Sequence, residues 1–299
     1  MYSVVVNNII KTYGKKKQKV TALNDISFKV KKGDIFGIIG PDGAGKTSLF
    51  RILTTLLLAD GGNATIEGLD VVKEYKKIRT KVGYMPGRFS LYQDLTVEEN
   101  LNFFATIFNT NVQENYHLIK DIYQQIEPFK DRRAGKLSGG MKQKLALSCA
   151  LVHKPDVLFL DEPTTGVDAV SRKEFWDMLK GLKQQGITIL VSTPYMDEAS
   201  LCDEVALIQS GKILQINSPQ NIIQQFGRKI IAAKSNNMLQ LLSEVKQLAD
   251  VEDAYPFGEY HHIVLKKGIN HLTLPTHVTT IAAEPNIEDC FMALMKTNN

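Results

Sequence analysis

The sequence has few cysteines and no long apolar run. Its three cysteines, Cys149, Cys202 and Cys290, are odd in number and far apart, and their spacing matches no metal or redox motif. We therefore predict free thiols in a reducing compartment. No stretch approaches the roughly 18 apolar residues that a membrane-spanning helix needs, and the first residues lack the pattern of a secretory signal. If the protein works at a membrane, another chain must supply the channel.

Charge of one sign is not in excess either. The chain has 36 Lys and Arg against 32 Asp and Glu, and its 43% hydrophobic and 23% charged residues are ordinary for a globular protein. The net charge of +4 is compatible with contact to an anionic membrane, although an ordinary solvated surface explains it as well. It gives no reason to expect a nucleic-acid partner. The basic run Lys15–Lys17 is predicted to be an exposed turn.

Short apolar runs alternate with helical segments along most of the chain. Strands are predicted at residues 4–6, 20–30, 35–39, 64–66 and 82–85, helices at 48–58, 97–136 and 140–152, and further strand-and-helix units up to about Gln225. This alternation argues for a mostly parallel sheet that is covered on its faces. Ligands bind such sheets beyond the carboxyl ends of the strands.

The pattern changes after about Gly227. A helical patch at 238–249 and a strand at 263–265 precede a final segment that begins at Pro285. We predict an α/β fold in which residues 1–226 form the main domain and residues 227–299 a small α+β accessory domain. His261 and His262 are predicted to lie on the strand surface rather than to bind a metal, because their spacing matches no ligand set.

A glycine-rich segment joins the strand predicted at 35–39 to the next helix. It contains Gly40, Pro41, Asp42, Gly43, Ala44, Gly45, Lys46, Thr47 and Ser48, and Gly40–Thr47 matches the P-loop pattern G-x-x-x-x-G-K-[ST]. Gly43 and Gly45 allow backbone N–H groups to point at phosphate oxygens, and the helix N-terminus adds positive potential. We expect Lys46 to neutralise the β- and γ-phosphates of ATP and the Thr47 hydroxyl to ligate Mg²⁺.

Two acids follow an apolar run further along the chain. Val157–Leu160 has the pattern of a buried strand, and Asp161 and Glu162 come directly after it. An acid at the end of a buried strand suits an outer-shell contact to Mg²⁺. The next acid is then placed to polarise the attacking water, because positioning and electrostatic stabilisation supply nearly all of phosphoryl-transfer catalysis. Asp161, Glu162 and Lys46 are the predicted catalytic residues, and Thr47 and Asp161 the predicted metal site.

Between these two motifs lies the run Leu137-Ser138-Gly139-Gly140-Met141-Lys142-Gln143. Ser138 is a suitable N-cap, and Gly139 and Gly140 expose backbone N–H groups at a helix N-terminus, which attracts anions. The three motifs in this order resemble an ATP-binding-cassette (ABC) ATPase, and the resemblance covers about residues 4–226. In that family the LSGG segment serves a nucleotide held by the opposite subunit, so the resemblance implies a dimer.

The same resemblance assigns further residues. Tyr13 matches the aromatic that stacks on adenine, and Asp168 matches the acid of the loop across the dimer interface. The end of the chain is similar to the accessory segment of drug-exporter-type members, whose final helix carries a Glu-Asp-aromatic pattern like that of Glu288–Phe291. A generic stabilising extension explains this segment equally well.

Two positions depart from the family pattern. Gly87 stands where the family has a glutamine that contacts Mg²⁺ and water, and Pro194 stands where it has a histidine that contacts the γ-phosphate. Loss of one preorganised donor typically costs roughly 10²–10³ in rate. We therefore expect this chain to bind ATP but hydrolyse it slowly, and to complete through its LSGG segment a competent site on a different ABC subunit. The alternative is a homodimer in which Gln93 or Tyr195 fills the gap.

The resemblance thus implies an ATP-binding subunit of an exporter-type ABC transporter, with ATP and Mg²⁺ as cofactors. Separate permease subunits would hold it at the cytoplasmic face of the membrane, docked near Leu91, Tyr92 and Leu95, unless these residues only pack their own loop. Two other classes remain open. One is a regulatory module that binds ATP without turnover. The other is an ABC protein that acts on DNA or ribosomes, which usually has a long coiled coil or two cassettes that this sequence lacks.

Overall fold

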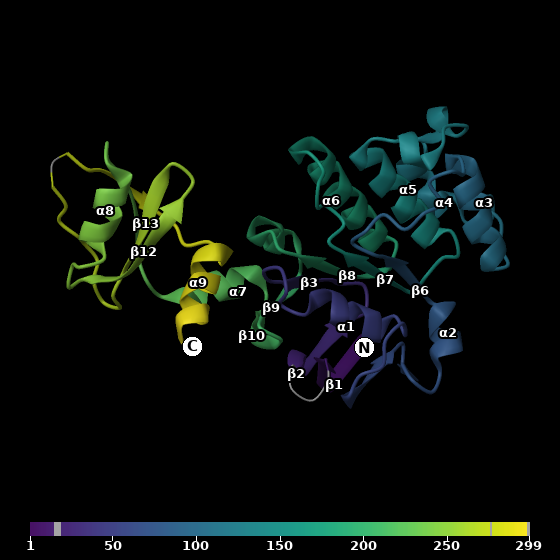
Figure 1. Ribbon diagram of the computed structural model, residues 1–299, viewed down its shortest axis with the longest axis horizontal. Helices are drawn as coiled ribbons and strands as arrows, with labels where there is room; N and C mark the ends of the chain where they lie inside the picture. The colour runs from purple at the N-terminus through teal and green to yellow at the C-terminus, as the bar shows by residue number, and fades with distance from the viewer. Residues whose placement is uncertain (15–18, 276, 298–299) are drawn as a thin grey trace. The chain divides into compact units, whose positions relative to one another are not determined.

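The chain folds into two compact units, Met1–Ser218 and Pro219–Asn299. The computed structural model describes residues 1–14, 19–275 and 277–297, and the turn expected at Lys15–Lys17 lies outside them. The first unit contains two sheets and helices α1 to α6, and the second a smaller sheet with α7, α8 and α9 (Figure 1). Helix α7 therefore belongs to the second unit by its contacts, whereas the boundary expected from the sequence follows it.

The larger sheet of the first unit is mostly parallel. Its strands are ordered β10 (Lys212–Asn217), β9 (Glu204–Gln209), β3 (Ile35–Ile39), β8 (Thr188–Thr193), β7 (Val157–Asp161) and β6 (Val82–Met85). Only β10 is antiparallel to its neighbour in this sheet. Every residue of β3, β7 and β8 is buried, as continuous apolar strands of a covered parallel sheet should be. The predicted α/β architecture is confirmed.

A second sheet of the same unit is antiparallel. Its strands are ordered β2 (Val20–Lys31), β1 (Tyr2–Tyr13), β4 (Gly61–Ile66) and β5 (Leu69–Asp70). Helix α1 (Lys46–Leu53) contacts β2, β4 and β7, so both sheets share one hydrophobic core. The helix stops earlier than expected because Thr55 adopts a left-handed conformation with φ of 63°, which a helix cannot continue through.

Helices cover the other face of the larger sheet, opposite α1 (Figure 1). They are α3 (Val97–Ile107), α4 (Tyr116–Tyr123), α5 (Gly139–Leu151) and α6 (Ala169–Gln184), while the short α2 (Tyr75–Arg79) precedes β6. The expectation of continuous helix over 97–136 is wrong. Asn109 takes a left-handed φ of 53° after α3, and beyond α4 the chain forms only 3₁₀ turns at Glu127–Phe129 and Ala134–Lys136. A further 3₁₀ segment, η3 (Met196–Leu201), follows β8.

The second unit is a small α+β structure. Its antiparallel strands are ordered β12 (Val251–Phe257), β13 (Tyr260–Leu265), β11 (Ile230–Lys234) and β14 (Thr279–Ala283). Its helices are α7 (Pro219–Phe226), α8 (Met238–Val245) and α9 (Ile287–Thr297). Leu241 and Val245 of α8 pack on Ala254, Ile263 and Leu265, which gives this unit a hydrophobic core of its own.

The prediction that His261 and His262 lie on the strand surface is wrong, because both are only 5% exposed. Their strand, β13, lies inside the sheet, and successive side chains point to opposite faces. Nε2 of His261 lies 2.7 Å from the carbonyl oxygen of Met238 on α8. Nδ1 of His262 lies 2.7 Å from Oδ1 of Asp289 on α9. Each face of the strand is therefore covered by a helix, which local spacing does not reveal.

Cys149, Cys202 and Cys290 are free and buried, as predicted, and burial raises the pKa of the Cys290 thiol to about 12. None of the helices in the described part of the chain combines the length and the hydropathy that crossing a bilayer requires.

The buried carboxylate of Asp289 should anchor α9. It accepts a hydrogen bond from the Tyr255 hydroxyl at 2.6 Å and from the backbone N–H of Asn286 at 2.8 Å, besides its contact with His262. Tyr255→Phe removes one donor and should cost about 1 kcal/mol. Asp289→Ala leaves several buried groups unpaired and should cost about 3 kcal/mol. Thermal unfolding of the full chain and hydrogen exchange in α9 measure both, with exposed Glu284→Ala as the control. Equal effects of the two core substitutions would contradict this role.

Candidate nucleotide-binding site

The candidate site lies where the carboxyl ends of four parallel strands meet. Strands β3, β8, β7 and β6 are consecutive neighbours in the sheet, so the loops that follow them share one edge. Backbone hydrogen bonds join these loops: the N–H of Gly40 donates to the carbonyl of Thr193 at 3.2 Å, and the N–H of Glu162 donates to the carbonyl of Ser192 at 2.9 Å. The fold thus brings together the glycine-rich loop and the two acids that the sequence singled out.

The loop after β3 requires its glycines. Gly43 and Gly45 have positive φ of 78° and 103°, a region in which only glycine is unstrained. A Cβ at Gly40 would lie 2.1 Å from the carbonyl oxygen of Ile208, and one at Gly45 would lie 2.3 Å from that of Ala22. Close packing against neighbouring backbone therefore fixes the path of the loop. Asp42 and Thr47 are exposed, and Ala44 is buried.

Lys46 opens helix α1 and is buried under the loop. Its Nζ donates to the carbonyl oxygens of Gly40 at 2.9 Å and Pro41 at 3.0 Å, and it lies 3.2 Å from Oε1 of Glu162. The cation is thus held at the N-terminus of a helix, where the backbone N–H groups also attract anions. A phosphate group that entered the loop, as predicted, would compete with Glu162 for this amine.

Glu162 and Asp161 are positioned by Ser192, at the end of β8. The Ser192 hydroxyl donates to Oδ1 of the buried Asp161 at 2.6 Å. Glu162 has a left-handed φ of 52°, which is strained for a residue with a side chain and is held by the hydrogen bond from its N–H to Ser192. Sequence reasoning missed Ser192. The available signal was a hydroxyl residue near the end of a buried apolar strand beside the site.

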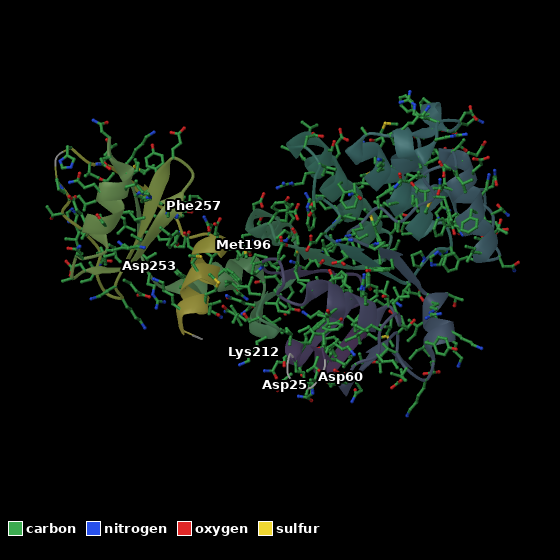
Figure 2. The ribbon with its side chains drawn as sticks, in the orientation of Figure 1. Asp25, Asp60, Met196, Lys212, Asp253 and Phe257 are labelled. Atoms are coloured by element: carbon green, nitrogen blue, oxygen red, sulfur yellow. The ribbon has the colours of Figure 1, made fainter. Side chains whose placement is uncertain are left out.

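Tyr13 stands at the end of β1 with 42% of its surface exposed. Its hydroxyl lies 3.0 Å from the hydroxyl of Ser48, in the first turn of α1. The end of the strand is held by Asp60, labelled in Figure 2, which accepts from the N–H of Thr12 at 2.7 Å and from Nζ of Lys11 at 2.8 Å. The hydrogen bond from Lys11 is the main cause of a lowered pKa of Asp60. An exposed aromatic face beside the P-loop helix suits stacking on a flat base.

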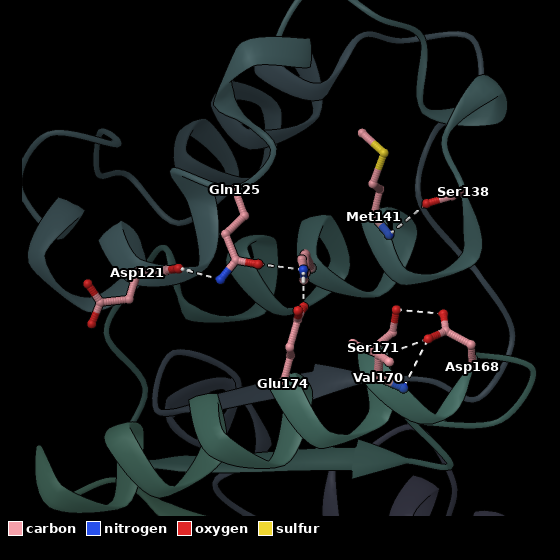
Figure 3. A network of polar contacts seen from close by, with 9 residues as sticks. Asp121, Gln125, Ser138, Met141, Asp168, Val170, Ser171 and Glu174 are labelled. Atoms are coloured by element: carbon pink, nitrogen blue, oxygen red, sulfur yellow. Dashed lines mark hydrogen bonds and ion pairs between the residues drawn. The ribbon is translucent and has the colours of Figure 1, made fainter.

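Ser138 and Asp168 begin two helices that contact each other, α5 and α6 (Figure 3). The hydroxyl of Ser138 accepts from the N–H of Met141 at 3.3 Å, and Asp168 accepts from the N–H of Ser171 at 3.0 Å and from its hydroxyl at 2.7 Å. These bonds from Ser171 lower the pKa of Asp168. A Cβ at Gly140 would lie 2.8 Å from the Ser171 hydroxyl, so any side chain there would displace the hydroxyl that donates to Asp168.

The chain is similar in sequence and in fold to known proteins. Residues 23–165 match the ABC transporter family. The chain is 38% identical over 283 residues to the probable multidrug ABC transporter ATP-binding protein YbhF of Escherichia coli, with 92% of this chain and 49% of YbhF covered, so it spans about half the length of that relative. It is 32% identical over 308 residues to the linearmycin resistance ATP-binding protein LnrL of Bacillus subtilis, with 96% of each covered. The chain belongs to the ABC transporter ATP-binding proteins.

Further relatives give the same result. The doxorubicin resistance ATP-binding protein DrrA of Mycobacterium tuberculosis is 34% identical over 276 residues, with 91% of this chain and 81% of DrrA covered. The dimeric ATP-binding cassette MJ0796 bound to ADP and Pi superposes with a TM-score of 0.65 at 25% identity, covering 72% of this chain and 98% of that one. The resemblance to ABC ATP-binding subunits of the drug-exporter type is confirmed, as is the cassette fold.

Gly87 and Pro194, the two positions expected to depart from the family pattern, lie beside the acids and after β8. A Cβ at Gly87 would lie 3.0 Å from the carbonyl oxygen of Asp161 and 3.7 Å from Cβ of Glu162, so the backbone of Gly87 is next to both acids. Gln93, six residues further on, instead accepts at its carbonyl from the N–H of Gly135 at 2.9 Å, just before the LSGG segment. Pro194 follows β8 and offers neither a side-chain donor nor a backbone N–H.

Two glycines of the loop should respond differently to alanine. Gly40→Ala forces Cβ against a carbonyl oxygen, and we expect a loss of about 3 kcal/mol in stability because the backbone must move. Gly43→Ala meets no atom within 4 Å, so it should cost only the left-handed conformation, about 1 kcal/mol. Thermal unfolding without nucleotide measures both variants. Equal losses would show that the packing of Gly40 on Ile208 does not constrain the loop.

Proposed function

We propose that this chain is the ATP-binding subunit of a membrane exporter. In this proposal a head-to-tail dimer couples ATP binding and hydrolysis to movement of separate permease subunits, and the chain is peripheral on the inner face of the cell membrane. The observation that carries it is the ion pair of 3.2 Å between Lys46 of the P-loop and Glu162, beside the buried Asp161. The names of three relatives support export of drug-like molecules: YbhF is a probable multidrug transporter protein, DrrA a doxorubicin resistance protein and LnrL a linearmycin resistance protein.

The residues at the strand ends fit ATP with Mg²⁺. The exposed hydroxyl of Thr47 and the carboxylate of Asp161 are oxygen donors, which hard divalent cations prefer. When bound, Mg²⁺ neutralises charge on the β- and γ-phosphates. Lys46 would add a second positive charge there, and Glu162, released from Lys46, would accept a hydrogen bond from the attacking water. Tyr13 would stack on adenine, and Ser138, Gly139, Gly140 and Asp168 would complete the site of the partner subunit.

We propose further that the chain's own site hydrolyses ATP slowly. Gly87 and Pro194 offer no side-chain donor, and the two candidate substitutes have other contacts. Gln93 lies against Gly135, and the ring of Tyr195 packs under the guanidinium of Arg172 at 4.1 Å. These contacts favour a heterodimer, in which a different ABC subunit supplies the competent P-loop, over a homodimer. A regulatory module that binds ATP without any turnover is the second candidate, favoured by the same two missing groups.

An apolar groove is the proposed dock for the permease. It has a volume of about 400 Å³ beside the segment after Gly87, and its lining includes Leu56, Met85, Leu91, Phe104, Ile107 and Ala150. Leu91 is buried in it, whereas Tyr92 is exposed on its loop and packs edge-on against Phe103, with ring centroids 4.7 Å apart. Asn100 holds this loop through hydrogen bonds to both the N–H and the carbonyl of Tyr92. Such a groove suits an amphipathic helix of a permease.

The groove gives a test of docking. Ile107 is 58% exposed at the groove, and Ile107→Asp places a charge where an apolar helix would bury it. We expect the affinity for the permease to fall by about 2 kcal/mol, as for a central interface residue. Co-purification of the membrane subunits measures it. The control is Leu239→Asp, at an 83% exposed position on α8. Equal retention of the permease by both variants would place the dock elsewhere.

Turnover tests the slow site. We expect steady-state Mg²⁺-ATP hydrolysis by the purified chain to lie well below the roughly 1–100 s⁻¹ of competent phosphoryl-transfer enzymes. The Gly87→Gln/Pro194→His double variant should raise it at least about tenfold, since one preorganised donor is worth roughly 10²–10³. Adding Glu162→Gln to the double variant should remove the gain. Fast hydrolysis by the unmodified chain would contradict the slow site and favour a homodimer.

A further inference from the structure

Two segments of the first unit are joined on either side of Pro194. One is the loop 162–168, which begins at Glu162 and ends at Asp168, and the other is the segment 192–198, which runs from the end of β8 into η3. The N–H of Glu162 donates to the carbonyl of Ser192 at 2.9 Å. The hydroxyl of Thr164 donates to Oε1 of Glu198 at 2.7 Å. The position that lacks the histidine of the family is therefore bracketed by two attachments to the loop that carries the catalytic acid.

The second attachment is buried and charged. Thr164 and Glu198 are each 1% exposed. A buried carboxylate is costly unless it is hydrogen-bonded and has a counter-charge nearby. Arg172 supplies that charge, with its Nε 3.7 Å from Oε1 of Glu198. Among the described residues, Thr164 alone donates a hydrogen bond to the Glu198 carboxylate, and Oε2 of Glu198 is buried without a hydrogen-bond partner.

Arg172 connects the same cluster to the helix that Asp168 caps. It lies in the first turns of α6, where its N–H donates to the carbonyl of Asp168 at 2.9 Å. Its guanidinium lies over the ring of Tyr195, 4.1 Å from the ring centroid, and its Nη1 donates to Oδ2 of Asp197 at 3.4 Å. The Arg172 side chain, on the helix that follows the loop 162–168, thus contacts three residues of the segment 192–198. They are Tyr195, Asp197 and Glu198.

We propose that Thr164, Arg172, Tyr195 and Glu198 form a positioning clasp. The clasp holds the loop 162–168 and the segment 192–198 as one body, so that Glu162 and Asp168 keep a fixed relation to the strand end at Pro194. None of its four residues belongs to the P-loop. The inference rests on the proposed function, because it assigns these residues to the orientation of the same catalytic acid. The clasp would also couple Glu162 at the nucleotide to Asp168 at the subunit interface without a histidine at position 194.

Hydrogen exchange of the full chain without nucleotide tests the clasp directly. Thr164→Val removes the donor to Glu198, and loss of one such hydrogen bond should raise exchange about tenfold at both 163–168 and 195–199. Thr164→Ser keeps the hydroxyl and should restore slow exchange in both segments. The control is Thr165→Val at the adjacent exposed threonine, which should leave 195–199 unchanged. Faster exchange in 163–168 alone would overturn the proposal.

A kinetic measurement separates positioning from simple stability. In single-turnover hydrolysis, Arg172→Ala should lower the rate about tenfold and leave the dissociation constant for ATP within about twofold, because Arg172 acts through Glu162. Arg172→Lys keeps the charge but loses the planar stack on Tyr195, so it should recover only part of the rate. The control is Lys173→Ala, at the adjacent exposed position of α6. A parallel loss of ATP affinity would assign Arg172 a merely structural role.

The two measurements fail separately. If the chain does not bind ATP, the proposed function is wrong, while the exchange experiment still decides whether the two segments move together. If ATP binds and the exchange of 195–199 does not respond to Thr164→Val, the clasp is wrong and the proposed function stands.

Discussion

The parallel pairing of β8 with both β3 and β7 is the constraint on which the site depends. It places the ends of three buried strands side by side, so the P-loop, the two acids and the segment at Pro194 must meet. Ser192 contacts both acids, since its hydroxyl donates to the carboxylate of Asp161 and its carbonyl accepts from the N–H of Glu162. The sheet sets the distance between the loops, so the pairing of mostly hydrophobic strands brings the polar groups at their ends, including Asp161 of β7 and Ser192 of β8, into contact.

Local patterns predicted the parts of the fold that have a local cause. The strand, the glycine loop and the helix around Lys46 are consecutive in the sequence, so a local motif predicts them. The alternation of strands and helices indicated the parallel sheet. The burial of His261 and His262 was missed because it depends on the place of β13 inside a sheet and on helices from elsewhere in the chain. The break after α3 was missed because it depends on a left-handed Asn109.

The same division applies to the site. Residues in contiguous motifs could be named from the sequence, and the structure brings Lys46, Asp161 and Glu162 to one edge of the sheet. Their roles remain predictions. Ser192, Arg172 and Glu198 could not be named, because each contributes through a partner far away in the sequence and none belongs to a glycine-rich or paired-acid pattern. Contacts between residues far apart in the sequence, from which the positioning roles are proposed, are therefore visible only once the strands are placed.

The ion pair between Lys46 and Glu162 has a consequence for the order of events. While the two side chains neutralise each other, the carboxylate is not free to act as a base, and the amine is not free to hold a phosphate. In the proposed function an arriving triphosphate would separate them, because it would bring a stronger set of anionic oxygens to the amine. In the proposed function, binding of the substrate would therefore free the carboxylate that orients the attacking water.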